Sequence, residues 1–148
     1  MKVIKLTPAS TDLNIVDCRL LTKEEAANLP DHLRRYDNLY WLMNKGDGDR
    51  SVAVVINGVV DEFGYMSGYS HIAIRPCLIL EGARKDNFVA GNRFVFNGSV
   101  FEIVNDKMAF CVKDIGVGAF SHNTNSYSKS WIKAHITDWF WNGCYEKS

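Results

Sequence analysis

Arg75 is the residue whose type and surroundings raise the first chemical question. It lies between Ile74 and Pro76, within a stretch, residues 71–80, that is otherwise mostly apolar. A guanidinium in such a place either contacts an anionic ligand or forms forked hydrogen bonds to a carboxylate or to loop carbonyl oxygens. Because a buried charge is retained only when it is paired, we favour the internal, structural role.

Metal binding has little support in the sequence. Asp47 and Asp49 lie in the Gly-rich segment 44–50, but an EF-hand loop that starts at Asp47 would need a bidentate Glu where this chain has Gly58. A solvated turn is the preferred interpretation. A zinc site built from distant side chains stays open, although no two of these form a metal-binding motif: His32, His71, His122, His135, Cys18, Cys77, Cys111 and Cys144.

The cysteines are better explained as core residues. Cys18, Cys77 and Cys111 lie in apolar text and are expected to be reduced and buried, as is common for free cysteines in a reducing compartment. Cys144, near the end of the chain, is expected to be exposed. We therefore predict no metal and no cofactor.

Nucleophilic catalysis has no motif to support it. The chain contains no G-x-S-x-G, no P-loop and no G-x-G-x-x-G. Cys111 and His135 are a conceivable thiol–imidazole pair, but His135 is expected on the apolar stripe of the last helix as a core or interface residue. We expect no enzymatic activity. The alternative is a small-molecule- or metal-binding domain, or an enzyme, that uses Arg75 and the loops 44–50 and 64–71.

Aromatic residues in two segments point to binding instead. In the first segment they alternate with Gly, Ser and Met66, a composition typical of adaptable binding loops. In the second they project from the last helix away from its apolar stripe, as aromatic residues at interfaces do. The other interpretation, which stays open, is that the sheet wraps this helix on both sides. The candidate binding residues are Tyr65, Tyr69, His71, Trp131, Trp141 and Tyr145.

The composition limits the remaining function classes. The chain has 148 residues, 17 basic and 17 acidic side chains and 47% hydrophobic residues, so we expect a single domain over residues 1–148. The balanced charge argues against non-specific nucleic-acid binding. No apolar run is long enough to span a membrane, and residues 1–12 lack the apolar core of a secretory signal, so we expect a cytoplasmic protein.

Capping and turn signals divide residues 13–80 into elements. Thr22 and Glu25 form a capping box at the start of a short helix, which Pro30 interrupts. Asn57-Gly58 predicts a type I′ hairpin turn. The expected strands and loops are a strand over 39–43, a turn at 44–50, a hairpin over 51–56 and 59–63, a loop at 64–70 and a central strand over 71–80 that is irregular near Pro76.

Residues 91–142 follow a polar connector, 84–92, and repeat this organisation. Asn97-Gly98 predicts the first turn of a three-stranded meander over 93–96, 99–104 and 108–113. In the last helix, apolar residues recur at helical spacing and form one stripe that packs on the sheet. Ser128 or Ser130 is expected to cap its start and Asn142-Gly143 its end. The predicted fold is therefore α+β, with antiparallel sheets and two helices.

Four short motifs resemble a known family. They are Leu21-Thr22-Lys23-Glu24-Glu25-Ala26, Tyr40-Trp41-Leu42, Asn57-Gly58-Val59 and Ile74-Arg75-Pro76-Cys77-Leu78. In order and spacing, residues 18–80 are similar to a bacterial and phage domain family of unknown function, with the patterns Leu-(Ser/Thr)-x-Glu-Glu-Ala, Trp-Trp-Leu-Arg-Ser-Pro-Gly, Asp-Gly-x-Val and Val-Arg-Pro-Ala-Leu. The resemblance implies a C-type-lectin-like fold.

The chain departs from that family in one motif. Met43-Asn44-Lys45 stands where the family has Arg-Ser-Pro, so a polar site built on that Arg and Ser is not expected here. The calcium-and-sugar signature of true C-type lectins is absent from the sequence, so the resemblance does not imply sugar binding.

The function predicted from residues and resemblance together is a non-enzymatic protein-binding module. The resemblance implies a phage or prophage origin, and a plausible role is then to bind and block a host defence protein such as a CRISPR nuclease. The expected partner is a protein. The sequence does not predict an oligomeric state.

Overall fold

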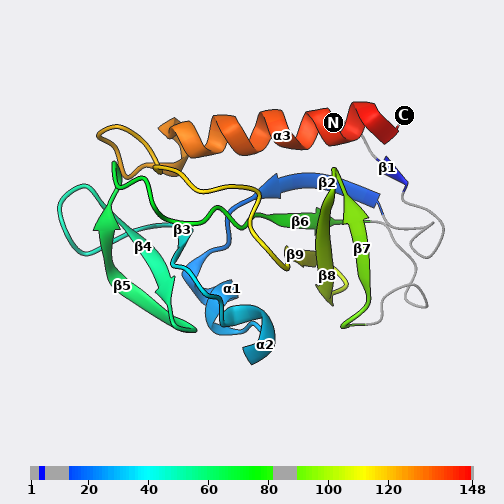
Figure 1. The fold of residues 1–148 in the computed structure, drawn as a ribbon, viewed down its shortest axis with the longest axis horizontal. Helices are drawn as coiled ribbons and strands as arrows, with labels where there is room; N and C mark the ends of the chain where they lie inside the picture. Colours follow the sequence, from blue (N-terminus) through cyan, green and yellow to red (C-terminus); the bar gives the residue numbers. More distant parts are fainter. Residues whose placement is uncertain (1–3, 6–13, 82–89, 148) are drawn as a thin grey trace.

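The computed structural model of the chain describes residues 4–5, 14–81 and 90–147. Its fold is α+β with two antiparallel sheets, as predicted, and three α-helices among the described residues, of which one is long (Figure 1). The strands are β1 Ile4–Lys5, β2 Asn14–Arg19, β3 Tyr40–Lys45, β4 Ser51–Ile56, β5 Val59–Met66, β6 Cys77–Leu80, β7 Arg93–Phe96, β8 Ser99–Asn105 and β9 Met108–Cys111. The helices are α1 Lys23–Ala27, α2 Asp31–Arg34 and α3 Trp131–Lys147, with a short 3-10 turn, η2, at Tyr127–Lys129.

The larger sheet has six strands in the order β1-β2-β6-β9-β8-β7, and the smaller has three in the order β3-β4-β5. The two Asn-Gly turns set the register of their hairpins, because both residues of each turn have the positive φ that this turn type needs: Asn57 51°, Gly58 80°, Asn97 50° and Gly98 79°. The predicted meander is confirmed as β7-β8-β9.

The two faces of the six-stranded sheet are covered differently. The long helix α3 lies along one face and buries Ile132, Ile136 and Phe140 there (Figure 1). The short helices α1 and α2 pack on the other face, where Ala26 and Leu33 are buried. Each of the two apolar clusters combines residues from 13–80 with residues from 91–144, because alternate side chains of every strand point to opposite faces.

The helix starts follow the capping signals. Thr22 accepts a hydrogen bond from the Glu25 backbone N–H while the Glu25 carboxylate accepts from the Thr22 N–H, which is the predicted capping box. The second turn expected after Pro30 is α2. Of the two serines considered for α3, Ser130 is the cap, since its Oγ accepts from the Lys133 N–H at 3.1 Å.

The predicted end of α3 was wrong. The helix continues through Asn142 and Gly143 to Lys147, and Gly143 is buried where the helix crosses the β7–β8 turn. A Cβ at this position would lie 2.7 Å from two ring atoms of Phe96 and 2.8 Å from the Cβ of Asn97. The glycine is therefore required for close approach of helix and hairpin. Within the described residues, no helix is long and apolar enough to cross a membrane.

Several side-chain and strand predictions also needed correction. Cys144 is fully buried on the face of α3 that meets the sheet, whereas His135 is exposed and does not belong to the core stripe. In the segment predicted as a single strand over 71–80, only Cys77–Leu80 joins the ladder, because Pro76 has no N–H and Ala73 forms only isolated bridges. The connector at 84–92 lies mostly outside the described residues.

Candidate functional site

The β4–β5 hairpin presents the first group of candidate residues. β5 pairs only with β4 and continues to Met66, so Tyr65 belongs to this strand and not to a loop. Its register shifts between Asp61 and Tyr65, where the Asp61 carboxylate accepts hydrogen bonds from the backbone N–H groups of Phe63 and Gly64 at 3.0 and 3.3 Å. Gly64 has a φ of 79°, and a Cβ there would collide with the Val52 carbonyl oxygen. This bulge twists the end of the strand and orients Tyr65.

Three predicted aromatic residues come together at this end of the hairpin. The ring of Tyr69 lies 5.6 Å from that of Tyr65 and 5.6 Å from that of His71, measured between centroids. Tyr65 and Tyr69 keep 36% and 47% of their surface exposed, and His71 is exposed as well. The group is therefore packed internally but open to a partner.

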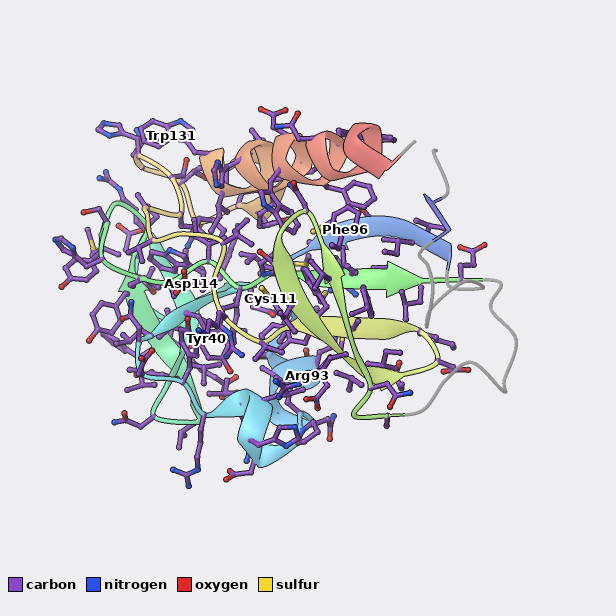
Figure 2. All side chains as sticks on the ribbon, turned by 45° about the vertical axis from the view of Figure 1, so that its right-hand side comes forward. Tyr40, Arg93, Phe96, Cys111, Asp114 and Trp131 are labelled. Atoms are coloured by element: carbon purple, nitrogen blue, oxygen red, sulfur yellow. The ribbon has the colours of Figure 1, made fainter. Side chains whose placement is uncertain are left out.

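A second pair of aromatic rings lies on the neighbouring loop. His122 stacks on Trp131 with ring centroids 5.8 Å apart and an interplanar angle of 23°. Trp131 is the first residue of α3, keeps 60% of its surface exposed and points away from the protein body (Figure 2). Sequence reasoning did not select His122, because nothing in the local sequence indicates which residue stacks on Trp131.

Backbone contacts join the two groups. The Ser121 N–H donates to the Ser67 carbonyl oxygen at 3.0 Å, and the Ser67 N–H donates to the Arg50 carbonyl oxygen at 3.0 Å. A Cβ on Gly68 would lie only 3.3 Å from the carbonyl oxygen of His122. Segments 64–71 and 121–131 are thus in direct contact. We call their exposed rings the aromatic surface; it comprises Tyr65, Tyr69, His71, His122 and Trp131.

The other two predicted binding residues lie elsewhere. Trp141 is ten residues after Trp131, about 15 Å further along α3, and it is partly buried against the apolar cluster with its ring 5.5 Å from that of Phe140. Tyr145 lies in the last turns of α3, where the structure describes the backbone but not this side chain. The structure therefore places Trp131, but not Trp141, beside the tyrosine group.

Arg75 is buried and fully surrounded by protein groups. Its guanidinium donates to the carbonyl oxygens of Cys111 at 2.9 and 3.2 Å, of Leu33 at 3.0 Å and of Val112 at 3.1 Å. Only 1% of the residue's surface is exposed. This arrangement agrees with the structural role expected from the sequence, with loop carbonyls as the partners.

Three aromatic rings close around the same guanidinium. Its central carbon lies 4.2 Å from the ring centroid of Tyr36, 4.5 Å from that of Tyr40 and 4.4 Å from that of Phe110, distances at which cation–π attraction operates. Burial lowers the pKa of Arg75 from its usual value and raises that of Tyr40 to about 12. Tyr40 and Cys111 lie together in the interior of the molecule (Figure 2), so this cation has no route to an external ligand.

The polar turn at 44–50 is held by its own backbone and by Ser51. The Asp47 N–H donates to the Glu62 carbonyl oxygen at 2.8 Å, and the Ser51 hydroxyl donates to Gly48 and Phe63 carbonyl oxygens at 2.9 Å each. Across the described residues, no three His, Cys, Asp or Glu side chains are grouped so that they could hold a metal ion.

One buried charged cluster was missed by the sequence reasoning. The Glu102 side chain in β8 is only 4% exposed; its Oε2 lies 2.6 Å from His32 Nε2 and its Oε1 lies 3.0 Å from Arg93 Nε. The register of the Asn97-Gly98 hairpin places Arg93 opposite Glu102, so this half of the cluster had a sequence signal. His32 reaches the site through α2, which the sequence does not position.

The four cysteines are free and buried, so the predicted exposure of Cys144 is the part of that interpretation that fails. Burial raises the pKa of the Cys77 and Cys111 thiols to about 12 and that of Cys18 well above its usual value. The thiolate, the reactive form, is disfavoured at these sites.

No family model, no curated protein and no solved structure matches the chain. The resemblance to the bacterial and phage domain family, and the C-type-lectin-like fold that it implies, stay predictions.

Proposed function

We propose that the protein is a non-enzymatic protein-binding module that contacts its partner through the aromatic surface. The observation that carries this proposal is the exposure of Trp131 and Tyr69 on two adjoining segments. Tyr and Trp are the residues that most often dominate protein interfaces, because each offers a large, rigid contact area and a polar group.

The local structure supports a role in recognition. Each exposed ring is held by a neighbour, Trp131 by His122 and Tyr69 by Tyr65 and His71. Rings that are already ordered lose less conformational entropy when a partner binds. The free edge of β5 is a less suitable site, because the bulge at 62–64 and the acidic residues Asp61 and Glu62 are features that discourage pairing with another strand.

The alternative of an enzyme or ligand-binding domain built on Arg75 is less well supported. Its guanidinium is engaged by carbonyl oxygens of Leu33, Cys111 and Val112, and loop 44–50 is closed by hydrogen bonds to its own strands. The remaining residues of that alternative, in segment 64–71, belong to the aromatic surface. These contacts favour the binding module.

The identity of the partner rests on less. A phage or prophage origin, and a host defence nuclease as the partner, are proposed from the family resemblance alone. A cytoplasmic site of action is supported by the four free, buried cysteines, since secreted domains usually pair theirs. The balanced charge of 17 basic and 17 acidic residues supports a protein partner over non-specific nucleic acid.

The test is affinity capture from a bacterial host lysate with three forms of the protein, followed by binding measurements with the purified partner. The forms are the wild type, a Trp131→Ala/Tyr69→Ala variant and a control, Val95→Ala/Val100→Ala, which truncates an exposed cross-strand pair on β7 and β8. We expect the wild type and the control to capture the same protein and the aromatic variant to bind at least about 30-fold more weakly. Equal capture by all three forms would reject the aromatic surface as the binding site.

A further inference from the structure

The face of the sheet opposite α3 contains a cavity that no part of the proposed binding surface explains. α1 and α2 have five and four residues, so each spans less than about 8 Å. They leave part of this face uncovered. The uncovered part is a cavity of about 430 Å³ between α1, the sheet and the β8–β9 turn, a volume within the range of small-molecule sites.

The floor of the cavity is apolar. Ile79 of β6 and Val104 of β8 line it and are only partly buried, and Met108 of β9 lies beside them. Apolar side chains in the middle of a sheet are normally covered by another layer. Here the cavity takes the place of that layer, so an apolar group that entered it would remove this surface from water.

One wall is a locked ion pair. Arg19 donates to both carboxylate oxygens of Glu25, at 2.8 and 2.9 Å, and to the Leu20 carbonyl oxygen at 3.0 Å. The Glu25 carboxylate also accepts from the Thr22 N–H in the capping box. Because these groups satisfy one another, they shape the cavity without offering it a free charge.

Two other lining residues do offer charges. Glu24 lies on α1 and Lys107 on the β8–β9 turn; both are exposed, and neither forms an ion pair with any residue that the structure describes. The backbone of Lys107 is fixed, since its N–H donates to the Asn105 side chain and its carbonyl oxygen accepts from Leu80, each at 2.8 Å. The cavity is therefore bordered by a carboxylate on the helix side and an ammonium on the turn side.

We propose that this cavity binds a small zwitterion of about dipeptide size, with its ammonium group against Glu24, its carboxylate against Lys107 and its apolar side chains on Ile79 and Val104. A free amino acid carries both charges on one carbon atom and would reach only one wall. A dipeptide separates them by a peptide unit. This site is on a different face from the aromatic surface and does not depend on the proposed partner.

The experiment is an NMR titration of the methyl groups of Ile79, Val104 and Met108 with the dipeptide Leu-Leu. Acetyl-Leu-Leu, which lacks the ammonium group, and Leu-Leu amide, which lacks the carboxylate, serve as matched ligands. We expect Leu-Leu to shift these methyl resonances at millimolar concentration and each matched ligand to bind about fivefold more weakly.

Protein variants assign each end of the ligand. Glu24→Gln is expected to abolish the difference between Leu-Leu and acetyl-Leu-Leu, and Lys107→Met the difference between Leu-Leu and its amide. Val104→Phe fills the floor and should remove binding, while Glu62→Gln and Lys133→Met, which change exposed charges outside the cavity, should leave it unchanged. The proposal is overturned if Leu-Leu does not shift these methyl groups, or if all three ligands bind equally to every folded variant.

Discussion

Two sets of aromatic residues in this protein have the same chemistry and opposite environments. Tyr36, Tyr40 and Phe110 surround the guanidinium of Arg75 in the interior, whereas Tyr69 and Trp131 lie on the surface against neighbours that do not cover them. The first set encloses a ligand that belongs to the chain itself. The second offers the same kind of contact with nothing in the described structure to fill it. The comparison teaches that exposure, not residue type, separates a structural aromatic cluster from a candidate binding surface.

The largest effect should follow from removing the cation of the buried set. Arg75→Met leaves the carbonyl oxygens of Leu33, Cys111 and Val112 without their donor in a buried place. Each such acceptor costs about 1–3 kcal/mol, so we expect the free energy of unfolding to fall by about 3–5 kcal/mol. Urea denaturation measures it.

The matched control for this variant is Arg35→Met. Arg35 forms an exposed ion pair with Asp31, and its loss should lower the unfolding free energy by less than about 1 kcal/mol. Equal effects of the two substitutions would show that the buried cluster contributes no more than a surface ion pair does.

A smaller effect is expected where a buried ring meets the last helix. Gly143→Ala would place a Cβ within 2.7 Å of the Phe96 ring, and we expect a loss of about 2 kcal/mol in unfolding free energy because the packed ring has to move. Alanine is the better helix former by about 1 kcal/mol, so propensity alone predicts a gain. Thermal and urea denaturation of this variant, with the exposed neighbour Asn142→Ala as control, decide between packing and propensity.

This position also shows why local signals were not sufficient for the fold. Asn142-Gly143 has the composition of a helix end, but the contact with Phe96, far away in the sequence, is the reason for the glycine. In contrast, the Asn57-Gly58 and Asn97-Gly98 turns and the capping box at Thr22 were predictable, because each depends on residues only a few positions apart.

The candidate site divides in the same way. Tyr65, Tyr69 and His71 could be grouped from the sequence, since they are near one another along the chain. That Trp131 lies next to them depends on the hydrogen bond between Ser121 and Ser67, for which the sequence has no signal. Contacts between distant segments are set by the whole packing arrangement, so an alternation or spacing rule cannot reveal them.

The buried tyrosines also predict a dependence on pH. Burial raises the pKa of Tyr36 and Tyr40 to about 12 from a usual 10.0. Because the folded pKa is the higher one, the stability from the neutral phenols is fully present below pH 10 and is lost as the pH rises through 12. Burial of Cys77 and Cys111 acts in the same direction from their usual 9.0.

The variant that isolates one contribution is Tyr40→Phe. The unfolding free energy of the wild type should fall between pH 10 and pH 12, and the fall should be shallower in the variant, by at most about 1.4 kcal/mol per pH unit for one group. Denaturation series at several pH values measure both slopes. If the slopes are the same, Tyr40 does not titrate differently in the folded and unfolded protein.

The smallest effect on stability, and the sharpest test of the comparison, is expected on the exposed set. Trp131→Ala and Tyr69→Ala remove rings that are 60% and 47% exposed, so each should change the unfolding free energy by no more than about 0.5 kcal/mol. Tyr40→Ala, which empties a buried position, should cost about 3–5 kcal/mol. If Trp131→Ala instead destabilised the protein as much as Tyr40→Ala, its ring would be needed for folding. Its exposure would then no longer argue for a partner, whereas unchanged stability together with lost capture would separate recognition from folding at the level of single side chains.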